Sequence, residues 1–197
     1  MLVILALCLL PELVLTGADL GLWGTARWRS IALGDGGFWP GLLTNWSPNY
    51  PLQWLLMFAS YGFLHAGFAH LLLNMVTLMS LGPAVVERMG PTGFVATYVV
   101  SLLGGAAGYA LLATSPMPMV GASGALFGLA GAILAMEFRD RSLDAEDRTP
   151  VITAAAALVA LNLVLWWAMS GLLAWQAHLG GFLAGAAYAR VTDRRRG

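Results

Sequence analysis

Charged residues are scarce in this sequence of 197 residues: Asp, Glu, Lys and Arg together make up 10% of the chain, against roughly 25% in a typical soluble domain. Lysine is absent, and all ten basic residues are arginine. Apolar residues make up 59% of the chain, and the mean hydropathy is +0.75. This composition excludes a disordered chain, a nucleic-acid-binding protein and an ordinary soluble enzyme. It predicts a protein that crosses a lipid bilayer several times.

Cysteine and histidine are also scarce in this sequence. Cys8 is the only cysteine, so the chain can form neither an intrachain disulfide nor a cysteine-based metal site. The histidines are His65, His70 and His178, and each lies in or beside an apolar segment. Because ionisable side chains are costly inside a bilayer, each of the three is a candidate functional residue.

The apolar residues are concentrated in six runs. A membrane-spanning helix needs about 20 mostly apolar residues. We therefore expect an all-α integral membrane protein with one domain over residues 1–197. The first run has no basic residues ahead of it and no small-residue cleavage site after it, which favours a span over a signal peptide. The expected spans cover about 1–22, 68–86, 93–113, 123–138, 151–169 and 176–189.

The segment over residues 24–61 differs from these runs. It contains four tryptophans, three prolines and the turn sequence Gly-Asp-Gly-Gly at 34–37, so it is too polar and too broken to span a bilayer. Tryptophan at this density is typical of the lipid headgroup region. We expect a long, partly helical loop that lies on or dips into one leaflet.

The arginines predict the orientation of the six spans. One side of the membrane would hold Arg27 and Arg29, and the other would hold the remaining eight: Arg88, Arg139, Arg141, Arg148, Arg190 and Arg194 to Arg196. Because basic loops stay in the cytoplasm, both termini are expected there and the long loop outside. The use of arginine alone, with abundant Ala and Gly, favours a bacterial inner (plasma) membrane.

A serine stands where a short connection meets an apolar helix, in Gly121-Ala122-Ser123-Gly124. The glycines permit a tight turn and close helix packing. The start of a helix offers free N–H groups that can hold an oxyanion beside a nucleophilic hydroxyl. The alternative is an ordinary helix-capping serine, which is a common feature.

His178 lies near the start of the last apolar run, and Gly181 and Gly185 follow it on the same helical face. The serine helix has the same spacing of small residues, at Gly124 and Gly128. Close packing of the two faces would bring Ser123 and His178 to one membrane depth, as a nucleophile and its general base. The alternative for His178 alone is an interfacial histidine bonded to a neighbour.

His70 and Asn74 are four residues apart and share a helical face, five residues after His65. An imidazole and an amide can both donate hydrogen bonds, which suits an oxyanion better than a metal. A polar clamp between helices is one alternative. A zinc site built from His65, His70 and His178 is another, but it lacks an acidic ligand nearby, so no metal is predicted.

The order of these motifs resembles that of the rhomboid intramembrane serine proteases. The pattern is H-x4-H-x3-N, then G-x-S-G at the start of a span, then A-H-x-x-G-x-x-x-G in the last span. The resemblance covers the chain from about Tyr61 onward. It implies a six-transmembrane-helix rhomboid bundle with a long first external loop, and it implies neither a metal nor an organic cofactor.

The resemblance also assigns roles to residues. Ser123 would be the nucleophile and His178 the general base, without an aspartate. His70, Asn74 and the Ser123 N–H would form the oxyanion hole, and Gly121 would shape the loop before the serine. The supporting residues would be Phe127, stacked on the catalytic histidine, the packing glycines Gly181 and Gly185, and His65.

Substrates implied by the resemblance are single-span membrane proteins that enter sideways from the lipid bilayer. The fifth span and the loop after it, about Leu165 to Trp175, would form the gate and include Trp166, Trp167 and Trp175. The alternative for these tryptophans is an aromatic belt at the membrane interface. The chain departs from the family pattern at Leu56 and Met57, where many rhomboids have Trp-Arg. This departure concerns the structure of the first loop and not the catalytic residues.

Three other functions are alternatives to a general intramembrane protease. The first is a catalytically silent rhomboid-like protein that binds membrane clients, and the second is a rhomboid-type enzyme specialised for C-terminal sorting segments. The third is a small transporter, but its usual mid-bilayer acidic residues are missing apart from Glu12. The presence of the complete set of Ser123, His178, His70 and Asn74 favours the protease.

Overall fold

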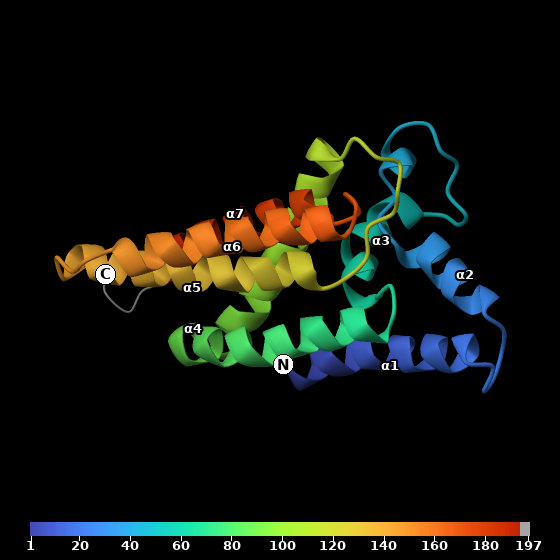
Figure 1. Ribbon diagram of the computed structural model, residues 1–197, viewed down its shortest axis with the longest axis horizontal. Helices are drawn as coiled ribbons and strands as arrows, with labels where there is room; N and C mark the ends of the chain where they lie inside the picture. Colours follow the sequence, from blue (N-terminus) through green and yellow to red (C-terminus); the bar gives the residue numbers. More distant parts are fainter. Residues whose placement is uncertain (194–197) are drawn as a thin grey trace.

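The computed structural model describes residues 1–193, and the regular secondary structure of this part of the chain is helical apart from one isolated β-bridge between Phe38 and Met119. The order of the elements along the chain is visible in the colours of Figure 1. They are α1 (Leu2–Asp19), α2 (Arg27–Gly36), η1 (Pro40–Leu43), α3 (Gln53–Ser60), η2 (Tyr61–Phe63), α4 (Phe68–Leu112), α5 (Ser123–Leu143), α6 (Thr149–Ala168) and α7 (Trp175–Thr192).

The long helix α4 folds back on itself at Gly90. This residue has φ 74° and ψ 172°, which is outside the helical region and available to glycine without steric cost. Pro91 follows and lacks the N–H that would continue the helix. The two legs, 68–89 and 91–112, correspond to the second and third expected spans. Among the described helices, α1, α4 and α6 are long and apolar enough to cross a membrane.

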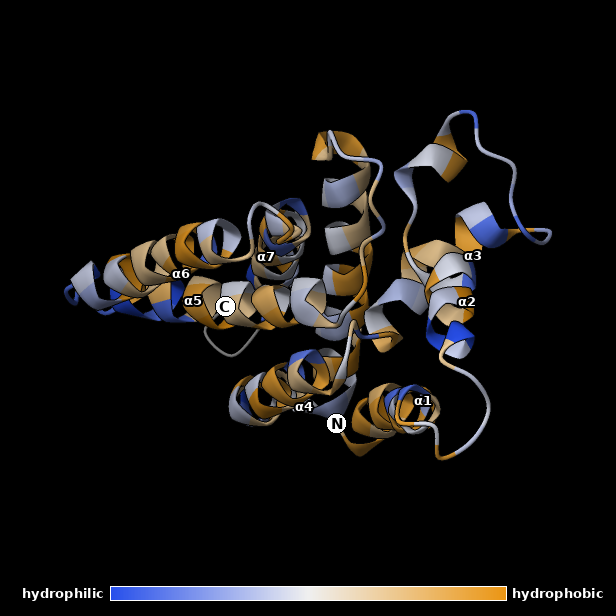
Figure 2. Ribbon diagram, turned by 45° about the vertical axis from the view of Figure 1, so that its right-hand side comes forward, coloured by the Kyte–Doolittle hydropathy of each residue, from blue (hydrophilic) through white to orange (hydrophobic). Residues whose placement is uncertain are grey.

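The second leg of α4 packs against α5 and α7 at the centre of the bundle, while α1 runs beside the first leg (Figure 1). The core between these helices is built from fully or nearly fully buried apolar side chains: Leu71, Leu78, Phe94, Tyr98 and Leu129. Many large apolar side chains of the helices are also exposed, and Figure 2 shows hydrophobic residues along most of the length of these helices. A surface of this kind is suited to lipid.

Two helices extend past the boundaries expected from hydropathy. We expected spans ending near 138 and 189, but α5 continues to Leu143 and α7 to Thr192. Hydropathy marks where a chain leaves the hydrocarbon, whereas helical hydrogen bonding continues into the polar region. There, Arg88 forms an ion pair of 2.6 Å with Asp193 and also bonds Asp140.

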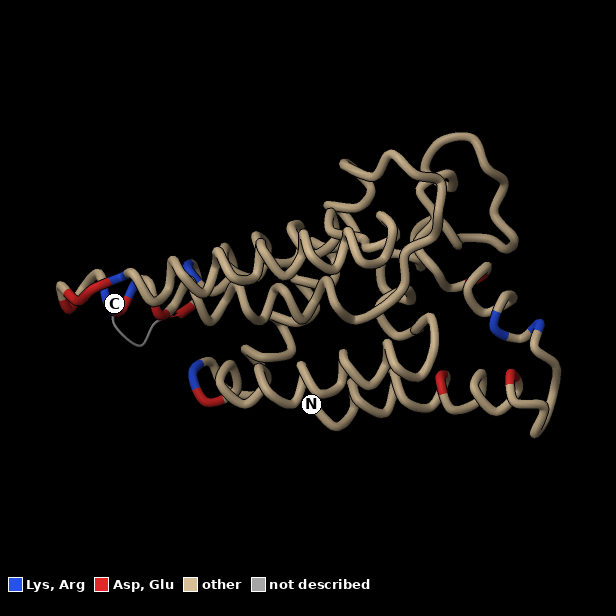
Figure 3. Tube along the Cα trace, viewed as in Figure 1, with Lys and Arg blue, Asp and Glu red and all other residues tan. Residues whose placement is uncertain are grey.

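The described arginines lie at the two ends of the bundle (Figure 3). The arginines of α2 are at one end, and the cluster in which Arg88 pairs with Asp140 and Asp193 is at the other. Arg194 to Arg196, on which the orientation prediction also depends, lie outside the described residues.

The segment over 24–61 is partly helical, as expected, and contains α2, η1 and α3 up to the start of η2. Two backbone hydrogen bonds of 2.9 Å between Phe38 and Met119 tie it to the connection that precedes Ser123. At the two positions of the missing Trp-Arg pair, Met57 is completely buried and Leu56 is half exposed. The loop is therefore anchored by contacts other than that pair.

Candidate active site

Ser123 and His178 lie together although they are 55 residues apart in the sequence. Ser123 is the first residue of α5, and His178 is in the first turn of α7. The distance from Ser123 Oγ to His178 Nε2 is 2.9 Å, which is a hydrogen bond. The His178 side chain is almost completely buried, whereas Ser123 is partly accessible. A hydroxyl in this position can transfer its proton to the imidazole.

Glycines bring α5 and α7 into backbone contact. A Cβ atom added to Gly181 would lie 1.9 Å from the Gly124 carbonyl oxygen, and one added to Gly185 would lie 2.0 Å from the Gly128 carbonyl oxygen. The structure thus has the packing of two small-residue faces that the sequence suggests. Because backbone atoms move less than side chains, this contact holds Ser123 and His178 at a fixed separation.

Two further side chains hold the His178 ring. Phe127 stacks on it with ring centres 4.2 Å apart and an interplanar angle of 7°. Asn162 of α6 lies on its other edge, with Oδ1 at 2.7 Å from His178 Nδ1. Sequence reasoning missed Asn162. The available signal was an amide inside the otherwise apolar run of 151–169.

His70 lies beside the connection that leads to Ser123. Gly121 has φ +119°, and a Cβ atom there would lie 2.7 Å from His70 Cε1, so only glycine fits. The backbone N–H of Ala66 donates to His70 Nδ1 at 3.4 Å. With Nδ1 accepting, the remaining proton of the neutral ring is on Nε2, which makes Nε2 a hydrogen-bond donor.

Asn74 is one turn further along α4 and is nearly buried. Its Nδ2 donates one hydrogen bond, of 2.8 Å, to the His70 carbonyl oxygen. An amide nitrogen carries two protons, so a second donor remains. His70 and Asn74 thus share a face of α4, as expected, and both can supply hydrogen bonds.

His65 lies beside His70, with ring centres 5.2 Å apart. It is fully buried in the connection before α4, and burial, followed by the charge of His70, lowers its pKa to about 4. Its carbonyl oxygen accepts a hydrogen bond of 3.1 Å from Arg29.

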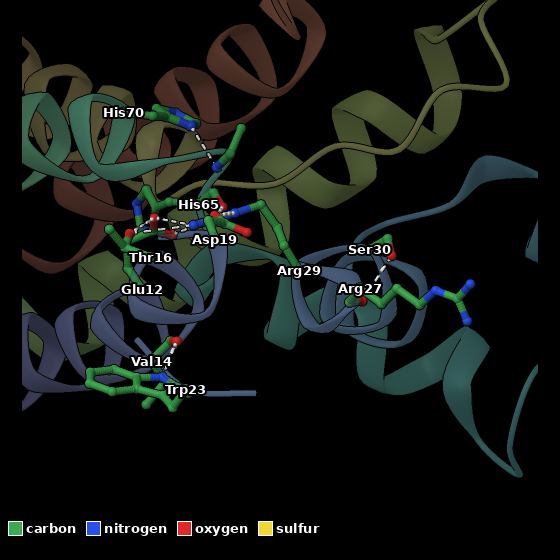
Figure 4. A network of polar contacts seen from close by, with 11 residues as sticks. Glu12, Val14, Thr16, Asp19, Trp23, Arg27, Arg29, Ser30, His65 and His70 are labelled. Carbon is green, nitrogen blue, oxygen red and sulfur yellow. Dashed lines mark hydrogen bonds and ion pairs between the residues drawn. The ribbon is translucent and has the colours of Figure 1, made fainter. Parts of the chain in front are cut away.

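Arg29 is the centre of a polar network that joins α1, α2 and the connection at His65 (Figure 4). Its guanidinium contacts both carboxylate oxygens of Glu12, at 2.8 and 2.9 Å, and Asp19 at 2.6 Å. The hydrogen bond to Glu12, more than any other contact, raises the pKa of Arg29 above its ordinary value. Glu12 is only 1% exposed, so Arg29 neutralises a buried charge. The sequence singled out Glu12 as an unusual residue but not its partner.

A cavity of about 550 Å³ opens between α6 and α7 and reaches His178. Apolar side chains line most of it, together with Asn162 and two residues of the expected gate, Trp166 and Trp175. Trp167 is outside the lining and is 79% exposed. Of the three tryptophans in the expected gate, Trp166 and Trp175 therefore line the cavity that reaches His178.

The histidines do not form a metal site. Within residues 1–193, no group of three or more His, Cys, Asp or Glu side chains could hold a metal ion. The rings of His65 and His70 are neighbours, while both ring nitrogens of His178 form hydrogen bonds, to Asn162 and Ser123.

The fold and the site together define a helical membrane protein that carries a serine–histidine pair at the start of two central helices. Comparison with known families agrees: residues 52–195 match the model of the Rhomboid domain. The chain belongs to the rhomboid family.

Several relatives are similar over about two thirds of this chain. RHOMBOID-like protein 5 of Arabidopsis thaliana is 37% identical over 123 residues, which are 62% of this chain and 39% of the relative. Rhomboid protease GluP of Bacillus subtilis is 34% identical over 122 residues, or 62% and 23% of the two chains. Putative rhomboid protease YdcA of the same organism is 33% identical over 137 residues, or 67% and 66%.

The matched region is about a third to two fifths of the length of the first two relatives. Family membership makes this chain an integral membrane protein.

Proposed function

We propose that this protein is a serine endopeptidase that hydrolyses a peptide bond in or next to the transmembrane segment of single-span membrane proteins. The observation that carries the proposal is the hydrogen bond of 2.9 Å between Ser123 Oγ and His178 Nε2, held by two helices in backbone contact. A serine next to a neutral histidine is an activated nucleophile.

In the first step, Ser123 Oγ attacks the substrate carbonyl carbon while His178 Nε2 takes the hydroxyl proton. The negative charge that develops on the carbonyl oxygen is stabilised by hydrogen bonds from His70 Nε2, Asn74 Nδ2 and the Ser123 N–H. The C–N bond then breaks, and His178 returns the proton to the leaving amine. Water hydrolyses the resulting acyl-enzyme by the same sequence of proton transfers.

The substrate reaches this site from the side. The cavity next to His178 is apolar and lies beside α6, whose surface is almost wholly exposed. A substrate helix must unwind to present its backbone to Ser123, and helix-breaking residues would lower the cost of doing so. We place the site at the periplasmic or external side of a bacterial inner membrane, with both termini in the cytoplasm. This orientation follows from the positive-inside rule.

The test is cleavage of a reporter in proteoliposomes. The reporter is a single-span protein with a helix-breaking pair of residues near the outer membrane boundary, and product is identified by mass. Wild type is compared with Ser123→Ala and His178→Ala. We expect cleavage by wild type only. Equal cleavage by wild type and Ser123→Ala would contradict the proposal, and reporter that binds to wild type without being cleaved would favour a silent, client-binding protein.

A further inference from the structure

Asn162 is an amide in a helix that is otherwise adapted to lipid. Val151 is the only buried residue of α6, and the apolar residues around Asn162 are exposed. An amide without a partner is costly in such an environment. Asn162 reduces this cost through one hydrogen bond, in which its Oδ1 lies 2.7 Å from Nδ1 of His178.

We propose that Asn162 is a positioning residue that completes a Ser123–His178–Asn162 hydrogen-bonded chain and fixes the reactive form of the histidine. The inference rests on the proposed function of Ser123 and His178. It assigns a role in the reaction to α6, which supplies neither the nucleophile nor the base.

The first part of the argument is the position of the proton on the ring. An amide oxygen can only accept, so His178 Nδ1 must donate to Asn162 Oδ1. In the neutral ring this leaves Nε2 without a proton, facing the Ser123 hydroxyl at 2.9 Å. The other tautomer would carry its proton on Nε2 and could not act as a base toward Ser123. Asn162 therefore selects the form that the reaction needs.

The second part is the orientation of the ring. Phe127 stacks on the imidazole at 4.2 Å and nearly parallel to it, which fixes the plane of the ring. A rotation of 180° about the Cβ–Cγ bond keeps the ring in that plane and leaves the stacking almost unchanged. It would put a carbon in the place of Nδ1. The hydrogen bonds to Asn162 at Nδ1 and to Ser123 at Nε2 distinguish the two edges, and only the first lies outside the reacting pair. The stack and the hydrogen bond thus fix different degrees of freedom.

The third part is the place of the bond. Asn162 and His178 both line the cavity of about 550 Å³ between α6 and α7. The bond crosses from one wall of this cavity to the other, so a displacement of α6 stretches it. The position of α6 therefore affects whether His178 is oriented to accept the Ser123 proton.

The test compares three variants on the proteoliposome reporter. Asn162→Leu keeps the approximate volume and removes the acceptor. Asn162→Asp keeps an acceptor oxygen at the same place. Val164→Ala is the matched control, because Val164 lies on the same helix two residues away, is exposed and does not line the cavity. Thermal unfolding in detergent is measured for each variant to identify any that are misfolded.

We expect Asn162→Leu to lower kcat about 10- to 100-fold while KM stays within about twofold, since a lost hydrogen bond to the base affects the reacting state more than substrate binding. Asn162→Asp should recover most of this loss, and Val164→Ala should behave like wild type. Wild-type kcat in Asn162→Leu would overturn the inference. So would an Asn162→Asp variant that is folded and as impaired as Asn162→Leu.

A spectroscopic readout separates this role from a structural one. Nitrogen NMR of histidine-labelled protein reports which ring nitrogen carries the proton, and the His178 signal is assigned by its loss in His178→Ala. We expect the Nδ1-protonated form in wild type and a mixture in Asn162→Leu. The same tautomer in both would overturn the inference. Loss of the proposed function itself would look different, because Ser123→Ala would then be as active as wild type.

Discussion

The helix pair α5–α7 and the neighbouring helix α6 are built in opposite ways. Glycines let α5 and α7 meet at their backbones, with space for no added carbon at Gly181 or Gly185. Helix α6 has one buried residue and borders a cavity instead of a packed interface. Under the proposed function, Ser123 and His178 therefore lie in the rigid part of the molecule, and the substrate would enter through the loosely packed part.

The largest effect should come from breaking the rigid pair. Gly181→Ala adds a single methyl group directly against the Gly124 carbonyl oxygen, so the backbones must separate. A displacement of about 1 Å at the reacting atoms can cost about 100-fold in rate, and overpacking of this kind costs about 1–3 kcal/mol in stability. Reporter cleavage and thermal unfolding measure the two effects.

The matched control is a substitution in the loosely packed helix α6. Ala156→Val enlarges an exposed residue of α6 and should leave both quantities close to the wild-type values. If Ala156→Val were as damaging as Gly181→Ala, the distinction between a rigid pair and a loosely packed helix would be wrong.

A second rigid connection lies at the N-terminal side, where Arg29 neutralises the buried Glu12. Arg29→Met leaves that carboxylate without its cation and should lower the free energy of unfolding by about 3 kcal/mol. Because Arg29 also bonds the His65 carbonyl, next to His70, activity should fall as well. The double variant Glu12→Leu with Arg29→Met removes both charges and should recover stability. Equal destabilisation in the single and double variants would argue against a charge-neutralising role.

The same region should respond to acid. The pKa of His65 is about 4 in the folded protein because the ring is buried and lies beside His70, whereas an unfolded chain has about 6.5. The neutral ring is favoured by folding, so its contribution is complete above about pH 6.5 and decreases as the pH falls toward 4. His65→Phe should flatten this acid limb in thermal unfolding measured from pH 7.5 to 4.5. An acid limb of the same slope in both proteins would show that another group is responsible.

The smallest effects concern the wall of the cavity. Trp166 lines the cavity beside His178, while Trp167 points away and is 79% exposed. Trp166→Leu should change KM for the reporter by about two- to fivefold, and Trp167→Leu should leave stability within about 0.5 kcal/mol and KM unchanged. Equal effects of the two substitutions on KM would mean that this cavity is not the path of the substrate.

The parts of the site that follow from the sequence are those with a local signature. Gly124, Gly128, Gly181 and Gly185 predict the close helix pair from their spacing alone, and the break at Gly90-Pro91 separates the two legs of α4 near the expected place. These features depend on helical periodicity or on backbone conformation, which neighbouring residues determine.

Contacts between distant segments could not be predicted in this way. Asn162 reaches His178 because of the relative register of α6 and α7, which no spacing within either helix encodes. Arg29 bonds Glu12 across a turn and a change of direction, although a buried glutamate implies that some cation is near. Helices α5 and α7 continue beyond the apolar runs that predict the spans, into a polar region where Arg88 pairs with Asp193 and bonds Asp140.

The most direct test of the central claim is the site of covalent modification by a fluorophosphonate probe, read by mass spectrometry of the intact and digested protein. The account predicts one phosphonyl group per chain, on Ser123, and none in either Ser123→Ala or His178→Ala. An adduct on another residue of wild type, or undiminished labelling of Ser123 in His178→Ala, would contradict it, because Ser123 would then not be a nucleophile activated by His178.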